Sequence, residues 1–123
     1  MSGVRVLTVH HEDGARRAAL AVVSATPGFK SMGEAASAEE ALELAIALPP
    51  ALALVGLNMP GIDGLETSAR LVAALPDTTV VLLYDSTEPN GNAVSDVQAA
   101  AALHTDSLTP QSLRALWEER PTR

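Results

Sequence analysis

Two kinds of hydrophobic pattern alternate along the chain. Short apolar runs are typical of buried strands, and segments whose apolar residues recur every three or four positions are typical of amphipathic helices. We predict strands over residues 4–9, 29–35, 51–55, 79–83 and 103–105. We predict helices over residues 13–25, 38–48, 64–74, 93–101 and from 110 onward. The chain is therefore expected to be an α/β protein with five strand–helix units.

Capping and turn residues mark several boundaries of these elements. Asp13 is a candidate N-cap for the first helix, and Ser37 is followed three positions later by Glu40, which is capping-box spacing. Pro110 is suited to the first turn of the last helix. Residues 84–92 contain proline, asparagine and glycine, and we expect them to form a loop.

Five successive strand–helix units predict a parallel sheet with helices on both faces. We see no linker and no internal repeat, and we expect one domain over residues 1–123 with a core from about 4 to 118. In such sheets the functional crevice lies at the carboxyl ends of the strands. The residues of interest therefore follow Val9, Val55, Leu83 and Thr105.

Composition narrows the classes of function. Hydrophobic residues make up 47% of the 123 residues and aromatic residues only 2%, which predicts a core of alanine, valine and leucine. A net charge of −7 with only 8 lysines and arginines argues against direct nucleic-acid binding by this domain. The sequence has no cysteine, no signal-peptide pattern and no apolar run of membrane-spanning length, so we expect a cytoplasmic domain without membrane contact.

One segment carries a family resemblance. Residues 50–64, Pro-Ala-Leu-Ala-Leu-Val-Gly-Leu-Asn-Met-Pro-Gly-Ile-Asp-Gly, resemble the signature of bacterial response-regulator receiver domains of two-component systems. Residues 4–12 resemble the first strand of that family, and the resemblance extends from Val4 to Trp117. It implies a flavodoxin-like (βα)5 three-layer sandwich with strand order 2-1-3-4-5.

The resemblance also implies where a phosphorylation pocket would lie. In the family, two acidic residues after the first strand and a phosphoacceptor aspartate after the third hold magnesium. A hydroxyl residue after the fourth strand and a lysine after the fifth contact the phosphoryl group. All of these positions depart from the family pattern here, and they fall on His10 and His11, Gly56, Tyr84 and Asp106, respectively.

These departures predict a domain that is not phosphorylated. Gly56 has no side chain on which an acyl phosphate could form, and the imidazoles of His10 and His11 are poor ligands for magnesium, which prefers oxygen. Asp106 would repel a phosphoryl group. We expect no cofactor and no metal, zinc included, because adjacent residues at a strand end should point to opposite sides.

Two hypotheses concern the interior of this pocket. In the first, His10 or His11 pairs with Asp106, which would raise the pKa of that histidine; the alternative is that both histidines are merely solvated. In the second, the ring of Tyr84 fills the space left at Gly56; the alternative is an exposed loop tyrosine.

Two kinds of function fit these expectations. The first is a phosphorylation-independent interaction module that acts in signal transduction or transcriptional regulation. It would bind a protein partner or a second copy of itself, by way of the helix at 93–101 or the last helix with Arg114, Trp117 and Glu118. Trp117 could equally serve ordinary core packing. The alternative is a small-ligand sensor with a pocket at Gly56, walled by Tyr84 and His10, that controls a DNA-binding output domain not present in this chain. We find no motif of an enzyme.

Overall fold

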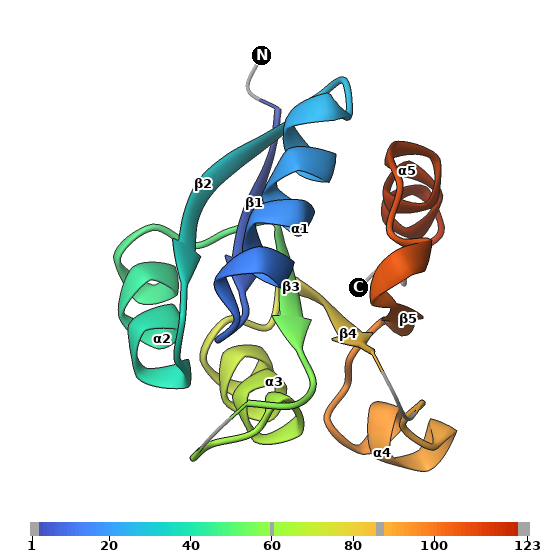
Figure 1. The fold of residues 1–123 in the computed structure, drawn as a ribbon. Helices are drawn as coiled ribbons and strands as arrows, with labels where there is room; N and C mark the ends of the chain where they lie inside the picture. The colour runs from blue at the N-terminus through green and yellow to red at the C-terminus, as the bar shows by residue number, and fades with distance from the viewer. Residues whose placement is uncertain (1–2, 60, 86–87, 121–123) are drawn as a thin grey trace.

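The computed structural model describes residues 3–59, 61–85 and 88–120. Within these ranges, strands and helices alternate along the chain (Figure 1). The strands are β1 (Val4–Val9), β2 (Phe29–Ala35), β3 (Leu52–Gly56), β4 (Thr79–Tyr84) and β5 (Ala101–His104). The helices are α1 (Asp13–Ala25), α2 (Ala38–Ala47), α3 (Gly64–Ala74), α4 (Gly91–Asp96) and α5 (Pro110–Glu118), with a 3-10 turn over Thr105–Ser107.

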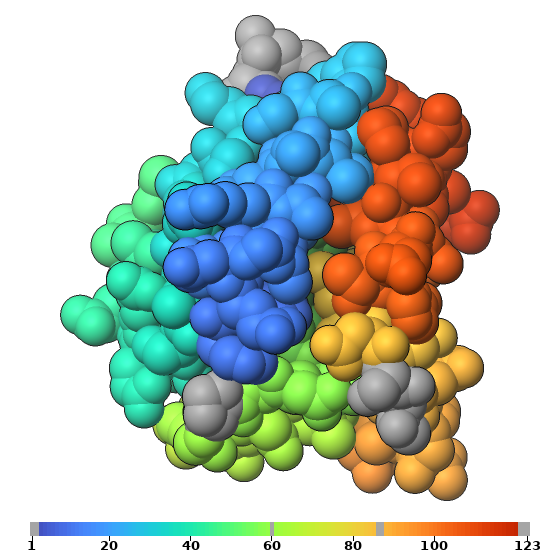
Figure 2. Space-filling model, in the orientation of Figure 1, coloured from blue at the N-terminus to red at the C-terminus, as the bar shows by residue number. Residues whose placement is uncertain are grey.

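The five strands form one parallel sheet in the order β2-β1-β3-β4-β5. One core cluster packs β1, β3 and β4 against α2 and α3, and a second packs the opposite face of the same strands against α1 and α5. In the space-filling view, α1 and α5 lie side by side over that second face (Figure 2). The three-layer architecture and strand order implied by the resemblance are confirmed.

Alternation along the central strands decides which residues face each layer. Leu7 and Val9 belong to the cluster under α2 and α3, whereas Val6 belongs to the cluster under α1 and α5. The last registered pair of β1 and β3 joins Val9 to Val55. The next residues on both strands therefore turn toward the α1 and α5 face and lie beside each other.

The predicted caps are partly confirmed. Ser37 accepts a hydrogen bond from the backbone N–H of Glu40 at 3.2 Å, but the Glu40 carboxylate accepts from Ala36 and does not close a capping box. The prediction for Asp13 is wrong, because Glu12 occupies the N-cap without a side-chain bond and Asp13 lies in the first turn. There its carboxylate accepts from Arg16, which is a stronger charge-assisted partner than a backbone amide.

The predicted helix over residues 93–101 is also wrong in its extent. Helix α4 ends at Asp96, and Ala101 already pairs with Val81 in the sheet. Alanine favours helix, but the open edge of β4 offers backbone hydrogen bonds that outweigh this propensity. The other predicted strands and helices agree with the structure to within one residue, except that β5 begins two residues earlier than expected.

No helix within the described ranges has the length and apolar character needed to cross a membrane.

Candidate functional site

The carboxyl ends of β1 and β3 bring His10 and Gly56 together. His10 is only 5% exposed, although histidine is polar and lies in a loop. A Cβ atom built on Gly56 would lie 2.6 Å from Cδ2 and 3.0 Å from Cγ of the His10 ring. Carbon atoms in van der Waals contact are about 3.5–4.0 Å apart. The imidazole therefore occupies the space that any side chain at position 56 would need, and we call this packing the His10–Gly56 contact.

Hydrogen bonds hold the His10 ring and backbone in place. The ring Nδ1 accepts from the backbone N–H of Glu12 at 3.1 Å, and the backbone N–H of His10 donates to the Ala35 carbonyl at 3.0 Å. An Nδ1 that accepts a hydrogen bond requires the neutral tautomer with its proton on Nε2. The ring also stacks on His11, with centroids 5.4 Å apart and planes 16° apart. The expectation that these two rings point to opposite sides is wrong, because His11 lies in the bend that follows His10, where strand alternation no longer applies.

Arg16 of α1 forms hydrogen bonds that hold the loop between β1 and α1 in place. Its Nη1 donates to the carbonyl of His10 at 2.9 Å, its Nε donates to Glu34 on β2 at 2.7 Å, and its Nη2 donates to Asp13 at 2.6 Å. The Arg16 side chain is 13% exposed. The hydrogen bond from Arg16 to the Asp13 carboxylate lowers the pKa of Asp13 below its usual value. Sequence reasoning missed Arg16, because its partners come from three separate elements.

The surroundings of His10 favour its neutral form. Burial lowers the pKa of His10 most, and the neighbouring His11 lowers it further, while Glu12 and Asp85 oppose the shift by raising it. Arg16 adds a smaller lowering effect. The predicted pairing with Asp106, which required a raised pKa, is therefore not supported by the electrostatics of the site.

Asp106 lies too far away to pair with either histidine of the first loop. In the strand order, β3 and β4 separate β1 from β5, which at about 4.8 Å per strand places the two loops roughly 14 Å apart. The Asp106 carboxylate is 92% exposed and lies 4.0 Å from Nδ1 of His104. Its backbone N–H donates to the same nitrogen at 3.0 Å. The hypothesis that His10 or His11 pairs with Asp106 is wrong.

Tyr84 does not fill the space at Gly56. Gly56 pairs with Leu83, which shares its face of the sheet, so Tyr84 turns to the opposite face. Its ring meets His104 edge-on, with centroids 5.5 Å apart and planes 89° apart. Burial and the nearby Glu88 raise the pKa of the phenol. The space over Gly56 is filled by His10 instead, and the ligand pocket expected there is closed by this ring.

The donor groups at this crevice do not fit the magnesium ion that the resemblance implies. Magnesium prefers oxygen ligands in octahedral geometry, whereas imidazoles stand at the two positions where the resemblance places the acidic pair, and His10 Nδ1 already accepts a hydrogen bond. Across the chain as described, no group of three or more histidine, cysteine, aspartate or glutamate side chains is arranged to hold a metal ion.

Two of the three predicted interface residues on α5, Trp117 and Arg114, make side-chain contacts within the chain. The Trp117 ring packs edge-on against Phe29 at 6.4 Å, and the Arg120 guanidinium lies 3.6 Å from its centroid. Arg114 donates to the Pro27 carbonyl at 2.6 Å. Trp117 is half-buried, while Arg114 and Glu118 are exposed. Trp117 therefore packs α5 against the start of β2, and its role in an interface stays a prediction.

Comparison with known proteins identifies the relatives of this chain. The family model described as response regulator receiver domain matches residues 6–108. A protein-glutamate methylesterase/protein-glutamine glutaminase from Myxococcus xanthus is 37% identical over 79 residues, which are 64% of this chain and 22% of that protein. The response regulator GacA of Pseudomonas viridiflava is 37% identical over 78 residues, 63% of this chain and 36% of GacA.

A solved structure shows the same architecture over the whole chain. The signal receiver domain of the response regulator NarL from Mycobacterium tuberculosis superimposes with a TM-score of 0.85 at 27% identity, covering 98% of this chain and 100% of that domain. In contrast, the matches to the two curated relatives span well under half of each protein's length.

Proposed function

This chain belongs to the response regulator receiver domain family, whose members act in two-component signalling, and we propose that it is an atypical receiver that works without phosphorylation. In this proposal it acts through protein–protein contact, with a partner protein or with a second copy of itself. It carries out no catalysis of its own, uses no cofactor and does not bind nucleic acid directly. Its location in the cytoplasm stays a prediction from the sequence.

The His10–Gly56 contact is the observation that carries the proposal. Gly56 ends β3, where the resemblance places the phosphoacceptor, and it has no carboxylate to attack a phosphodonor. The buried His10 ring occupies the adjoining space, so a phosphoryl group could not enter beside Gly56 without displacing it. The missing nucleophile and the filled pocket are two independent obstacles to phosphorylation.

The remaining pocket positions support the same conclusion. His11 stands where a magnesium-binding carboxylate would be expected, and Tyr84 packs on His104 on the opposite face of the sheet. Asp106 exposes a negative charge where the resemblance places a lysine that would contact the phosphoryl group. Like charges repel, so this position would weaken phosphate binding.

Treatment with acetyl phosphate and Mg²⁺ tests the proposal, with intact-protein mass spectrometry as the readout. A receiver domain that carries the phosphoacceptor aspartate, treated in parallel, serves as the positive control. We expect a phosphoryl adduct on the control and none on this chain. A stoichiometric phosphoryl adduct on this chain that hydroxylamine removes, as it removes an acyl phosphate, would overturn the proposal.

Self-association is the simplest form of the proposed interaction. On α5, the candidate interface residues with exposed side chains are Arg114 and Glu118. Sedimentation velocity over a range of concentrations, on the wild type and Glu118→Arg, tests this part. We expect the wild type to form a dimer as its concentration rises, and we expect the charge reversal to weaken this dimer. A monomer at every concentration would rule out self-association and leave binding to a different protein.

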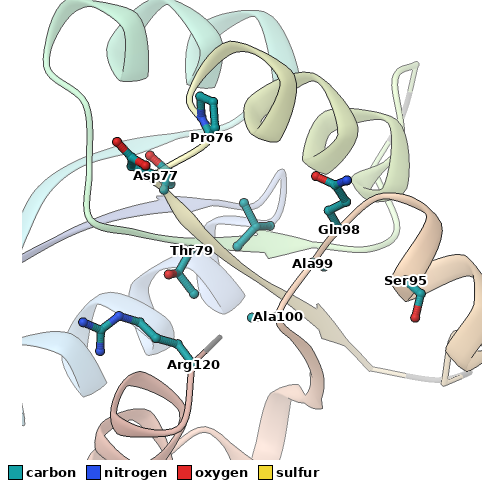
Figure 3. A pocket seen from close by; sticks show the side chains of 10 residues that line it. Pro76, Asp77, Thr79, Ser95, Gln98, Ala99, Ala100 and Arg120 are labelled. Atoms are coloured by element: carbon teal, nitrogen blue, oxygen red, sulfur yellow. The ribbon is translucent and has the colours of Figure 1, made fainter. Parts of the chain in front are cut away.

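A small-ligand sensor that controls a DNA-binding output domain is the second candidate. Its pocket cannot be the one expected at Gly56, because His10 fills that space. The observation that favours this candidate is a hollow of about 450 Å³ at the amino end of β4, which Thr79 and Val80 help to line (Figure 3).

A further inference from the structure

Consecutive apolar residues are exposed where α2 ends. They are Ile46, Ala47, Leu48 and Pro49, which we call the α2 patch. Ile46 is 63% exposed and Leu48 is 50% exposed, and no other large hydrophobic residue in the described ranges is exposed. An exposed apolar run favours non-specific association, so a folded domain usually keeps one only where it binds something.

The helix itself keeps these side chains out of the core. The buried residues of α2 are all alanines, and the last of them is Ala45. Ile46 comes next and is therefore turned by about 100° from Ala45 around the helix axis. The helix ends at Ala47, and Leu48 already has an extended backbone with a φ of −146°. Both large side chains of the α2 patch therefore lie outside the core.

The α2 patch lies beside the outer edge of the sheet. Helix α2 packs along β2, which is the edge strand (Figure 1). A Cβ atom built on Gly33 would lie 3.9 Å from Cδ1 of Leu44, so Leu44 lies against this part of β2. Leu48 follows one helical turn later, and a turn of about 5.4 Å is nearly the length of two strand residues. Because the helix runs back along the strand that it follows, Leu48 lies near Ser31 and Lys30.

Two cations stand beside the α2 patch. Lys30 is exposed on β2, and its partner in the register of β1 is Arg5. Nη2 of Arg5 donates to the Pro49 carbonyl at 2.9 Å, so this guanidinium lies at the end of the patch. Phe29 packs into the core under α1 and α5, so the next residue, Lys30, points to the α2 side. Neither cation forms an ion pair with a described residue.

These local charges outweigh the net charge of −7 for a small partner. Salt at physiological concentration screens exposed charges beyond about 8 Å, so a short segment responds mainly to the charges next to it. Those are Lys30 and Arg5, with Glu43 as the nearest acid on α2. An anionic membrane is broad and would meet the acids of the whole face, so the net charge disfavours it.

We propose that the α2 patch binds a short segment of a partner protein in which large apolar side chains stand next to acidic ones. The apolar side chains would cover Ile46 and Leu48, and the carboxylates would meet Lys30 and Arg5. Stable interfaces between folded proteins involve about 20–30 residues a side, far more than this patch and its cations, which favours a segment over a second copy. This inference rests on the proposed function, because it supplies a surface through which such a receiver contacts another protein.

Two synthetic peptides, added to the whole chain, test the inference. Both contain the same leucines, and one carries glutamates where the other carries lysines. We expect the acidic peptide to shift the amides of residues 30–31 and 46–48 in a saturable manner. The basic peptide should bind about tenfold more weakly or less, because it meets repulsion instead of attraction at the two cations.

Matched variants separate the contributions. Ile46→Ser and Lys30→Gln should each weaken binding of the acidic peptide severalfold, and both positions are exposed, so the protein stays folded. Arg17→Gln removes the same charge from an exposed position on α1 and should leave binding unchanged. Glu43→Gln should strengthen binding, because it removes the nearest acid on the helix. The inference is wrong if the acidic peptide shifts none of these amides, or if Lys30→Gln and Arg17→Gln have equal effects.

Two other occupants of the α2 patch would also overturn the inference. Shifts of residues 46–48 that grow with protein concentration in the absence of peptide would assign the patch to a second copy of the chain. Binding to phosphatidylserine vesicles, abolished by Ile46→Ser and seen without peptide binding, would assign it to a membrane. None of these results bears on phosphorylation, which the mass measurement decides separately.

Discussion

The His10–Gly56 contact predicts that two substitutions depend on each other. Gly56→Ala adds a Cβ atom that would lie 2.6 Å from the His10 ring, about 1 Å inside a normal contact. The ring is buried and held by the Glu12 N–H, so it cannot move aside freely. Overpacking of this kind typically costs about 1–3 kcal/mol, and we expect Gly56→Ala to lower the free energy of unfolding by about 2 kcal/mol.

The same substitution should have a different effect once the ring is gone. In a His10→Ala background the new Cβ meets no imidazole, and alanine in a strand is favoured over glycine by about 0.5–1 kcal/mol. Gly56→Ala should therefore be neutral or slightly stabilising in that background. The two results together predict a coupling energy of about 2–3 kcal/mol between positions 10 and 56, within the range for residues in direct contact.

Urea unfolding of the wild type, the two single variants and the double variant measures this coupling. The slopes of the four unfolding curves should agree, so that differences in midpoint report differences in stability. If Gly56→Ala costs the same with and without the His10 ring, the ring does not occupy the space over Gly56 and the reasoning fails.

Three further predictions follow from other parts of the structure. The pKa of His10 in the folded state lies below its unfolded value of about 6.5, so the unfolded state binds a proton more readily. The free energy of unfolding should therefore fall as the pH drops below about 6.5. Urea midpoints at several pH values measure this dependence, which His10→Gln should flatten. Gln98 has a φ of 60°, a left-handed conformation that glycine adopts at lower cost. Gln98→Gly should therefore raise the free energy of unfolding by about 0.5–1 kcal/mol, and a lower melting temperature would contradict this reasoning. Arg16→Leu removes the donor to the His10 carbonyl, so hydrogen exchange of the Glu12 amide should become faster; an unchanged rate would show that Arg16 does not hold this loop.

The sequence predicts the sheet and most of its helices because the hydrophobic periods are clear. It fails at α4, where an alanine-rich segment has no pattern of its own. Pairing with the neighbouring strand decides whether this segment is helix or strand, since Ala101 pairs with Val81 of β4. The hollow beside Thr79 depends on that register and could not be predicted.

The candidate site could have been predicted further than it was. Counting alternate residues along β1 and β3 places residue 10 beside residue 56 on one face, and the implied strand order already separates β1 from β5. These two facts favour His10 as the group over Gly56 and argue against a pair with Asp106. What the sequence does not contain is the path of the loop after Val9, which stacks His11 on His10 and lets Arg16 reach the His10 carbonyl.

The His10 ring lies against Gly56, in the space that a Cβ at position 56 would occupy, and the whole account depends on this placement. A nuclear Overhauser measurement between the His10 ring protons and the Gly56 Hα protons tests it most directly, at a pH above 7 where the imidazole is neutral. We predict strong cross-peaks from the ring Hδ2 to both Hα protons, together with ring-current shifts of these protons that disappear in His10→Ala. Absent cross-peaks, with ring protons that show only contacts to solvent, would contradict the account.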